Sequence, residues 1–237
     1  MAASTGTLLI VSTPIGNLDD FSPRAKQILS TVDYILCETT QQTRKLGITT
    51  RLTRYEGHGF KAKAQQARVI QDLSQGKNVA LVSNAGTPLI SDPGLSLVQA
   101  VVSASLPIVH IPGPVAFVSA LITSGLPTKN VLFIGFLPKK DGVIQKEFEK
   151  AKTALRMLDD KASLVCYVSK YQIQRTLDAV KIVFGASVSV SLARELTKLY
   201  EEHKTGRIGE IIEWVKESKN HGKGEFTLVL TIPDNNV

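Results

Sequence analysis

Short apolar runs alternate with segments of helical periodicity along the first half of the chain. Four apolar residues bounded by turn-forming residues are typical of a buried strand, whereas apolar residues spaced three or four apart indicate an amphipathic helix. Strands and helices that alternate at this spacing predict a parallel sheet. The predicted strands are Leu8 to Val11, Tyr34 to Cys37, Val79 to Val82 and Ile108 to Ile111, and the predicted helices are Ser22 to Leu29, Thr40 to Leu46, Lys61 to Leu73, Ser96 to Ser103 and Val115 to Thr123.

The second half alternates in the same way but carries many more charges. No Lys, Arg, Asp or Glu occurs from Pro93 to Thr128, and charged residues return directly afterwards, so we expect the boundary between two α/β domains at residues 127 and 128. The charge-free segment does not predict a membrane span, because four prolines interrupt it and a span needs about 20 continuous apolar residues. The predicted strands are Val131 to Phe136, Leu164 to Val168, Val188 to Leu192 and Phe226 to Ile232, and the predicted helices are Lys146 to Leu158, Gln172 to Val183 and Ile208 to Val215.

Charge and cysteine content limit the possible partners. The net charge of +7 is spread over both halves, which favours a polyanionic partner such as RNA without requiring one. Cys37 and Cys166 lie in apolar runs and indicate buried reduced thiols rather than a disulfide. The histidines, among them His58, show no metal-ligand spacing with the cysteines, so we expect no metal site. The N-terminus lacks the basic region of a secretion signal, and we expect a cytoplasmic protein.

The sequence does not contain a convincing nucleotide-binding motif. The chain contains no Gly-x4-Gly-Lys-Ser/Thr phosphate loop. Gly57-His-Gly-Phe-Lys-Ala62 fits the spacing of a dinucleotide-binding motif, but it follows a polar run and no acidic residue stands about 20 positions later. We therefore interpret this segment as a turn.

Four loops share one character, since each follows a predicted strand and contains proline, glycine and small polar residues. Tight turns of an α/β protein explain any one of them, but three follow strands of the same predicted sheet. Such loops gather at the carboxyl edge, where ligands of this fold class bind. The first three contain no Lys or Arg, which suits an adenosyl sulfonium better than a phosphate-bearing ligand. The loops are Ser12 to Asn17, Ser83 to Gly94, Pro112 to Ala116 and Gly135 to Pro138.

Seven motifs together resemble one family. They are Thr13-Pro-Ile-Gly-Asn17, Val82-Ser-Asn-Ala-Gly-Thr-Pro88, Ile90-Ser-Asp-Pro-Gly94, Pro112-Gly-Pro114, Ser124-Gly-Leu-Pro127, Gly135-Phe-Leu-Pro138 and Ala193-Arg-Glu-Leu-Thr-Lys198. They are similar to those of the tetrapyrrole-methylase superfamily, specifically its bacterial small-subunit ribosomal RNA cytidine 2′-O-methyltransferases. The resemblance implies two α/β domains of the tetrapyrrole-methylase type with the cofactor cleft between them, S-adenosyl-L-methionine as cofactor, ribosomal RNA or the small ribosomal subunit as partner, and a homodimer.

The resemblance also implies residue roles. Positions of the family's cofactor loops match residues of both halves, although the family has Ser-Ala where this chain has Val115 and Ala116, so one hydroxyl is lost. For these two positions, packing explains the residues as well as binding does. The implied cofactor contacts are Pro14, Ile15, Gly16, Gly86, Thr87, Ile90, Ser91, Val115, Ala116, Tyr167 and Ala193.

Other family positions are altered. Asn84 replaces an aspartate, Thr39 and Gln41 stand in a segment that loses an acid, an arginine and a histidine, and Val168 replaces a glutamate. These changes fall at polar positions that the resemblance places on the substrate side. They leave open a methylase of another substrate, such as a tetrapyrrole-like small molecule or another RNA. They also leave open a relative that binds cofactor or RNA with impaired catalysis.

A ribose hydroxyl is a poor nucleophile and benefits from a general base or from a cation near the developing alkoxide. We expect Glu195 or Lys198 to assist deprotonation and Arg194, with Arg44 and Lys45, to hold phosphates. Surface ion pairs are the equally plausible alternative for each of these residues. A second basic group, which a solvated helix face also explains, comprises Lys139, Lys140, Lys146, Lys150 and Lys152.

Overall fold

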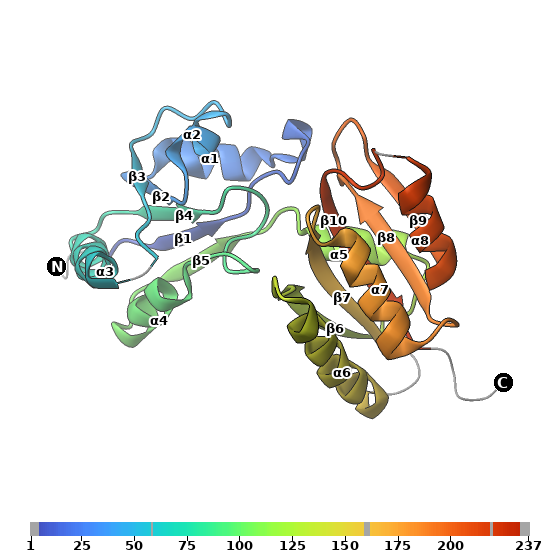
Figure 1. Cartoon of the computed structure of the whole chain (residues 1–237). Coiled ribbons are helices and arrows are strands. Elements are labelled where there is room, and N and C mark those ends of the chain that lie inside the picture. Colours follow the sequence, from blue (N-terminus) through green and yellow to red (C-terminus); the bar gives the residue numbers. More distant parts are fainter. Residues whose placement is uncertain (1–4, 58, 159–161, 219, 233–237) are drawn as a thin grey trace. The chain divides into compact units, whose positions relative to one another are not determined.

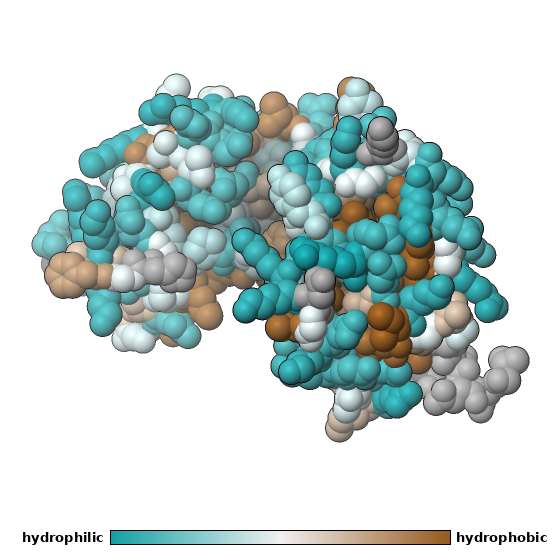
Figure 2. Space-filling model, in the orientation of Figure 1, coloured by the Kyte–Doolittle hydropathy of each residue, from teal (hydrophilic) through white to brown (hydrophobic). Residues whose placement is uncertain are grey.

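The computed structural model describes residues 5–57, 59–158, 162–218 and 220–232. Two compact units make up the chain, Met1–Val115 (unit 1) and Ala116–Val237 (unit 2), each built on a five-stranded sheet (Figure 1). Polar side chains dominate the visible surface of both units (Figure 2). The interpretations of the N-terminal four residues and of His58 lie outside the described residues.

The sheet of unit 1 is parallel throughout, as the sequence predicts, with strand order β3-β2-β4-β1-β5. Alternate residues of each strand face opposite sides, and both sides are covered by helices, which explains why the central strands are continuous apolar runs. The strands are β1 (Leu8–Val11), β2 (Tyr34–Cys37), β3 (Leu52–Arg54), β4 (Val79–Val82) and β5 (Ile108–Ile111).

Two hydrophobic cores lie on the two faces of this sheet. Leu9 and Val11 of β1 pack on the side of α1 (Pro23–Thr31), which Ser22 caps by accepting a hydrogen bond from the Ala25 N–H. Leu8 and Ile10 pack on the other side, against two further helices. The remaining helical segments of unit 1 are η1 (Leu18–Asp20), α2 (Thr40–Arg44), α3 (Gly59–Ser74) and α4 (Leu95–Ser103).

The sheet of unit 2 is mixed, with strand order β6-β7-β10-β8-β9. Only β6 and β7 pair in parallel, and the remaining neighbours are antiparallel. Three helices pack on the core face, and α5 (Ala116–Thr123) contacts β7, β8 and β10. The other elements are β6 (Asn130–Phe136), α6 (Asp141–Met157), β7 (Ala162–Ser169), α7 (Ile173–Phe184), β8 (Ser189–Arg194), β9 (Glu202–Arg207), α8 (Ile208–Glu217) and β10 (Glu225–Thr231).

The boundary between the units differs from the expected one. Residues 116–127 belong to unit 2, although the sequence placed them in the first domain. Helix α5 contacts β7, β8 and β10 of the second sheet, although its Val118 and Ile122 side chains are exposed, so the return of charged residues after Thr128 does not mark the change of domain.

Strands β3 and β9 were not predicted. Strand β9 reads Glu-His-Lys-Thr-Gly-Arg and lies at the edge of its sheet, where one face and one side contact solvent. Edge strands carry charges that discourage further pairing, and such a strand has no apolar signature. None of the helices in the described ranges has the length and apolar character needed to cross a bilayer.

Candidate functional site

Three of the four small-residue loops meet at the carboxyl edge of the unit 1 sheet. They follow β1, β4 and β5, which are adjacent strands in the order β4-β1-β5. Thr13 of the first loop and Gly86 of the second exchange two backbone hydrogen bonds, with N···O distances of 2.9 and 3.0 Å. The expectation that these loops share one edge of a parallel sheet is therefore confirmed.

Hydroxyl groups connect the same loops. The Oγ of Ser12 lies 2.7 Å from the Oγ1 of Thr87, and Thr87 Oγ1 donates to the carbonyl of Pro114 at 3.1 Å. Ser12 Oγ also lies 3.2 Å from Nε2 of His110. Ser12 and Thr13 are almost fully buried, so their hydrogen bonds connect the loops in the interior of unit 1. Thr87 is partly exposed to solvent.

Two glycines permit this close packing. A Cβ at Gly113 would lie 2.7 Å from the Cβ of Ser12, which is closer than two such carbons approach. Gly86 has φ +78°, a conformation that residues with a side chain rarely adopt, and a Cβ there would lie 3.2 Å from Cγ2 of Ile15. These two glycines thus allow the backbones of neighbouring loops to approach each other closely.

The second loop also contains strained backbone. Leu89 (φ 73°) and Ser91 (φ 66°) occupy the left-handed region on either side of Ile90. Each such residue costs about 1 kcal/mol or more, and this kind of strain is found preferentially at ligand clamps. Of the predicted cofactor contacts in unit 1, Pro14 and Gly86 are buried. Solvent reaches the others to different extents: Ile15, Thr87, Ile90 and Val115 are partly exposed, and Gly16 and Ser91 are exposed.

Asp92 is a functional candidate that the sequence analysis passed over. Burial and the negative charge of Glu38 raise the pKa of its carboxyl group, a hydrogen bond from Ser83 opposes both effects, and the pKa lies at about 6. A carboxyl group with a pKa near neutrality exchanges protons readily under physiological conditions. The available signal was an acidic residue alone in a loop of small and apolar neighbours, next to the predicted contacts Ile90 and Ser91.

Two predicted cofactor contacts of unit 2 lie at the same level of its sheet, on either side of strand β10. Tyr167 of β7 and Ala193 of β8 are both in register with Thr227 of β10, which lies between them. The hydroxyl of Tyr167 accepts a hydrogen bond from the Phe117 N–H at 3.3 Å, directly after the predicted contact Ala116. Two rings of β6, Phe133 and Phe136, have centroids 5.1 Å from that of Tyr167.

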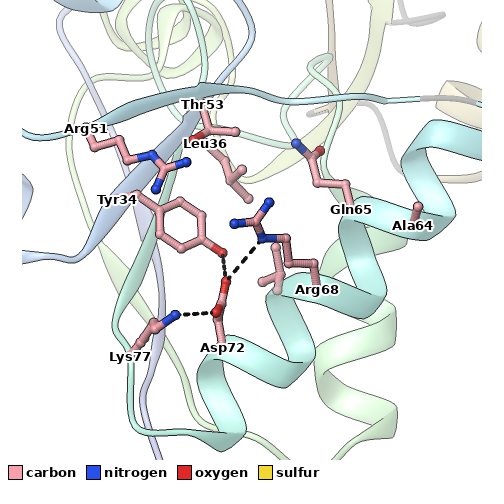
Figure 3. A pocket seen from close by; sticks show the side chains of 10 residues that line it. Tyr34, Leu36, Arg51, Thr53, Ala64, Gln65, Arg68, Asp72 and Lys77 are labelled. Atoms are coloured by element: carbon pink, nitrogen blue, oxygen red, sulfur yellow. Dashed lines mark hydrogen bonds and ion pairs between the residues drawn. The ribbon is translucent and has the colours of Figure 1, made fainter.

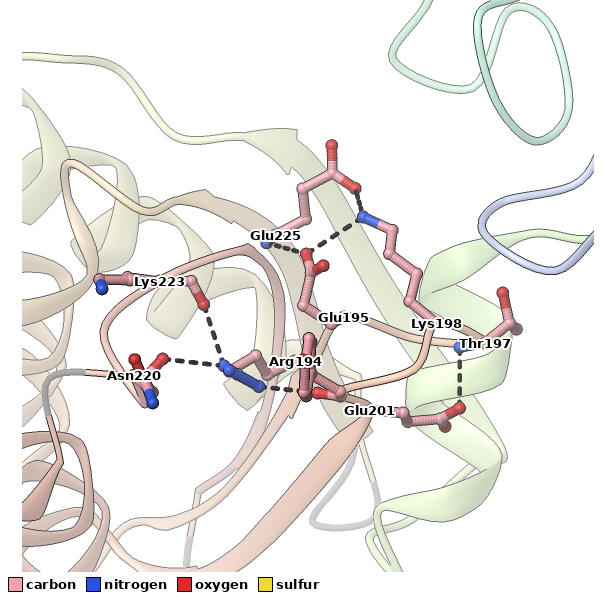
Figure 4. A network of polar contacts seen from close by, with 9 residues as sticks. Arg194, Glu195, Thr197, Lys198, Glu201, Asn220, Lys223 and Glu225 are labelled. Atoms are coloured by element: carbon pink, nitrogen blue, oxygen red, sulfur yellow. Dashed lines mark hydrogen bonds and ion pairs between the residues drawn. The ribbon is translucent and has the colours of Figure 1, made fainter. Parts of the chain in front are cut away.

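Arg194 has a structural role, which corrects its assignment to phosphate binding (Figure 4). The residue is only 6% exposed. Its Nε donates to the carbonyls of Asn220 (3.2 Å) and Lys223 (2.9 Å), and one terminal nitrogen donates to the carbonyl of Tyr200 (2.7 Å). That nitrogen also lies 2.9 Å from Glu202 Oε2, an ion pair whose geometry is not that of a hydrogen bond. Nε and one terminal nitrogen of the guanidinium are thus engaged inside unit 2.

Glu195 and Lys198 neutralise each other (Figure 4). Lys198 Nζ lies 3.1 Å from Glu195 Oε1 and 2.7 Å from Glu225 Oε2, and Glu195 Oε1 also accepts from the Glu225 N–H at 2.8 Å. Burial alone would raise the pKa of Glu195, but that N–H and the ammonium more than offset it, so the pKa lies below its usual value. Burial would lower the pKa of Lys198, but the two carboxylates hold it above its usual value. Near neutral pH the Lys198 ammonium has no lone pair to accept a proton, and the paired Glu195 carboxylate of lowered pKa is a weak base, which does not suit the general-base role predicted for either.

The other substrate-side residues divide into exposed and buried positions. Arg44 and Lys45 end the short helix α2, are exposed, and form no ion pair with any described residue. Gln41 and Asn84 are exposed and Thr39 is partly exposed, so their side chains are accessible to a substrate. Val168 is 2% exposed and packs in the core of unit 2, so its expected place on the substrate side is wrong. Among the described residues no His, Cys, Asp and Glu cluster has the arrangement of a metal site.

Comparison with known proteins supplies the family. A model of the family described as Tetrapyrrole (Corrin/Porphyrin) Methylases matches residues 7–212. The chain is 42% identical over 229 residues to the ribosomal RNA small subunit methyltransferase I of Halalkalibacterium halodurans, covering 95% of this chain and 75% of that protein. The Escherichia coli O157:H7 protein of the same name is 40% identical over 232 residues, covering 96% and 78%.

Solved structures agree on the fold. The methyltransferase CobJ superposes with a TM-score of 0.66 at 17% identity, covering 97% of this chain and 95% of that one. The uroporphyrin-III-C-methyltransferase from Thermus thermophilus gives a TM-score of 0.64 at 17% identity, covering 95% and 94%. Together with a family model that spans most of both units, these matches show that the chain is a methyltransferase that belongs to the tetrapyrrole methylase family.

Proposed function

We propose that this methyltransferase transfers a methyl group from S-adenosyl-L-methionine to the 2′-hydroxyl of a cytidine ribose in small-subunit ribosomal RNA. The observation that carries the proposal is the similarity over nearly the whole chain to two proteins named ribosomal RNA small subunit methyltransferase I. The net charge of +7 is compatible with an RNA substrate.

The donor set of the unit 1 edge suits this cofactor. Loops built from glycine, small hydroxyl-bearing residues and backbone carbonyls, with no Lys or Arg in them, offer shape and hydrogen bonds without adding positive charge next to a sulfonium. When bound, the cofactor supplies an activated methyl group. We assign its contacts in unit 1 to Pro14, Ile15, Gly16, Gly86, Thr87, Ile90, Ser91 and Val115, and Ala116, Tyr167 and Ala193 of unit 2 stay predicted contacts.

Methyl transfer from a sulfonium is an in-line displacement, so positioning of the reacting groups contributes most to the rate. We infer that Asp92 removes the proton of the ribose hydroxyl, because it directly follows the assigned contacts Ile90 and Ser91 in the loop after β4 and is partly exposed. Its pKa of about 6 leaves it mostly ionised yet able to accept a proton at neutral pH. Lys198 stays protonated but is paired with Glu195 and Glu225, so we assign the phosphate contacts to the exposed residues Arg44 and Lys45.

The altered exposed positions favour a second candidate. Thr39, Gln41 and Asn84 differ from the family pattern at accessible sites, as expected for a relative that binds cofactor and RNA with weakened catalysis or methylates another substrate. A homodimer and a cytoplasmic location follow from the resemblance and are part of the proposal.

Methyl transfer to ribosomal subunits tests the proposal. Small subunits from a bacterial strain that lacks its own 2′-O-methyltransferase of this type are incubated with the chain and S-adenosyl-L-methionine carrying a labelled methyl group. We expect label at a single cytidine, in a ribose-modified nucleotide that resists alkaline hydrolysis. Cofactor binding without label supports the impaired relative, and label only on a tetrapyrrole or another RNA overturns the assigned substrate.

A further inference from the structure

A second cavity of unit 1 lies away from the small-residue loops. It has a volume of about 300 Å³ and is lined by residues of β2, β3 and α3 (Figure 3). Tyr34 is the first residue of β2, Arg51 directly precedes β3, and Lys77 precedes β4. Because these strands are parallel, the cavity reaches the amino edge of the sheet, opposite the edge that carries the loops.

Asp72 organises the inner end of this cavity (Figure 3). Its side chain is 10% exposed and accepts hydrogen bonds from the Tyr34 hydroxyl (2.9 Å) and from Lys77 Nζ (2.6 Å). Burial would raise the pKa of Asp72, but these two donors and the lysine charge hold it below the usual value. The positive charge of Lys77 is therefore neutralised by the Asp72 carboxylate. Gln65 is engaged as well, because its side chain bonds the Glu56 N–H and the Arg54 carbonyl, each at 2.8 Å.

Two arginines remain available in the same cavity. Arg68 Nε lies 4.0 Å from the nearer oxygen of Asp72, beyond hydrogen-bond distance, and the Arg68 side chain is 71% exposed. Arg51 is exposed and has no ion pair with a described residue. Both guanidinium groups reach toward the Tyr34 ring (Figure 3). Asp72, which also forms the long ion pair with Arg68, is the one carboxylate among the lining residues and faces three cations, so the lining carries a net charge of +2.

The floor of the cavity is apolar. Leu36, Ala64 and Val69 line it beside the Tyr34 ring. A cavity of this size is at the lower end of the range for small-molecule sites, which combine an apolar lining with a few placed polar groups. Two planar guanidinium forks match the oxygens of a phosphate, and the apolar lining residues suit a ring.

From these features we propose that the cavity between α3 and the β2–β3 strands binds a phosphate group carried on a small ring-bearing body, that is, a nucleotide. The nucleotide is either free or part of an RNA strand. The inference uses only contacts of unit 1 and stands independently of the methyl-transfer proposal.

Titration with matched ligands tests this site. Cytidine 5′-monophosphate, cytidine and inorganic phosphate are added to the whole chain, and backbone amide NMR shifts are followed at low salt. We expect saturable shifts at Thr53, Gln65 and Lys77 with the nucleotide, weaker ones with phosphate and none with cytidine. Arg51→Gln and Arg68→Gln should each weaken nucleotide binding by about tenfold or more, since each removes charge-assisted hydrogen bonds. Arg24→Gln, an exposed arginine of α1, is the control and should not change it.

The outcomes separate the ligand sources and the two proposals. A short oligoribonucleotide that competes with the nucleotide, and loses affinity in the same two variants, identifies RNA as the source, whereas no competition identifies the free nucleotide. Equal binding of cytidine, absence of saturable shifts, or an equal loss in Arg24→Gln overturns the proposal. Binding of S-adenosyl-L-methionine should be unchanged in Arg51→Gln, because the loops lie at the other edge of the sheet.

Discussion

Two carboxyl groups in strained loops, Asp92 of unit 1 and Glu195 of unit 2, respond in opposite ways to their surroundings. Asp92 follows Ser91, which has φ 66°, and Glu195 itself has φ 50°. Burial and a neighbouring carboxylate raise the pKa of Asp92 to about 6. Glu195 experiences burial too, but a backbone N–H and Lys198 lower its pKa below the usual value. The first group is able to take up a proton near neutral pH, and the second is fixed as an anion.

The family motifs in the sequence do not show which of these two loops carries the proton-accepting group. Both carry family motifs, and both contain residues in the left-handed region. In unit 1 the polar groups at the edge are hydroxyls and backbone atoms, several of which are accessible. In unit 2 the charges of Arg194, Glu195 and Lys198 are taken up by internal partners. We therefore assign proton transfer to the loop of Asp92, and we assign to the loop of Glu195 the role of stabilising the fold of unit 2.

Removal of the buried arginine should have the largest effect. Arg194→Ala leaves the carbonyls of Asn220, Lys223 and Tyr200 without their donor, and we expect the free energy of unfolding to fall by about 3 kcal/mol. Urea denaturation measures the change, with Lys216→Ala on the exposed face of α8 as a control expected within about 0.5 kcal/mol of the unsubstituted chain. A folded Arg194→Ala chain of unchanged stability that has lost RNA binding would restore the phosphate-binding role.

Asp92→Asn tests the opposite member of the pair. The carboxylate form increases as pH rises through about 6, so methyl transfer by the unsubstituted chain should rise over that interval. The variant should be about 100-fold slower and should lose this pH dependence. A pH profile of the labelled-methyl assay at saturating cofactor provides the measurement.

Stability gives an independent readout for the same residue. The pKa of Asp92 is higher in the folded chain than in the unfolded chain, so the folded state binds more protons between pH 4 and 6. The contribution of Asp92 to stability is present at low pH and is lost as pH rises through about 6. Asp92→Asn should therefore raise the melting temperature above pH 7 relative to its effect at pH 4. An equal effect at both pH values would contradict the raised pKa.

Gly113→Ala tests the packing between the loops of unit 1. The new Cβ would lie 2.7 Å from the Cβ of Ser12, so the first and third loops must separate. We expect calorimetry to give an affinity for S-adenosyl-L-methionine that is lower by about tenfold or more. Gly209→Ala on α8 meets no atom within 4 Å and serves as the matched control. Unchanged affinity in Gly113→Ala would separate these loops from cofactor binding.

Glu195→Gln should have the smallest effect on activity. The amide keeps an oxygen for the Glu225 N–H and loses the ion pair with Lys198, which we expect to lower stability by about 1 kcal/mol. The methyl-transfer rate should stay within about threefold of the unsubstituted chain, because Glu195 has no proton to exchange near neutral pH. A loss as large as that of Asp92→Asn would return the base role to Glu195.

The sequence predicted what depends on local pattern. Buried parallel strands read as apolar runs, and the order of strands and helices was sufficient to place three loops at one sheet edge. Strand β9 was missed because an edge strand of charged residues has no apolar alternation. The domain boundary was displaced because the apolar composition continues through α5, and composition does not reveal which sheet a helix contacts.

The site was predictable only in part, for a physical reason. Motif spacing identifies which loop a residue belongs to, but the protonation and availability of a side chain depend on partners distant in the sequence. Arg194 is engaged by carbonyls near Asn220 and Lys223, and Val168 is buried under distant helices. The raised pKa of Asp92 likewise depends on Glu38, which is contributed by another strand end.

Amide NMR shifts on addition of S-adenosyl-L-methionine test the central claim most directly. The account predicts saturable shifts at Gly16, Gly86, Thr87 and Ser91, with no change at Lys77 on the opposite edge of the sheet. Saturable shifts confined to the region of Lys77 and Arg51, or no saturable shift anywhere in unit 1, would contradict the assignment of the small-residue loops to the methyl donor.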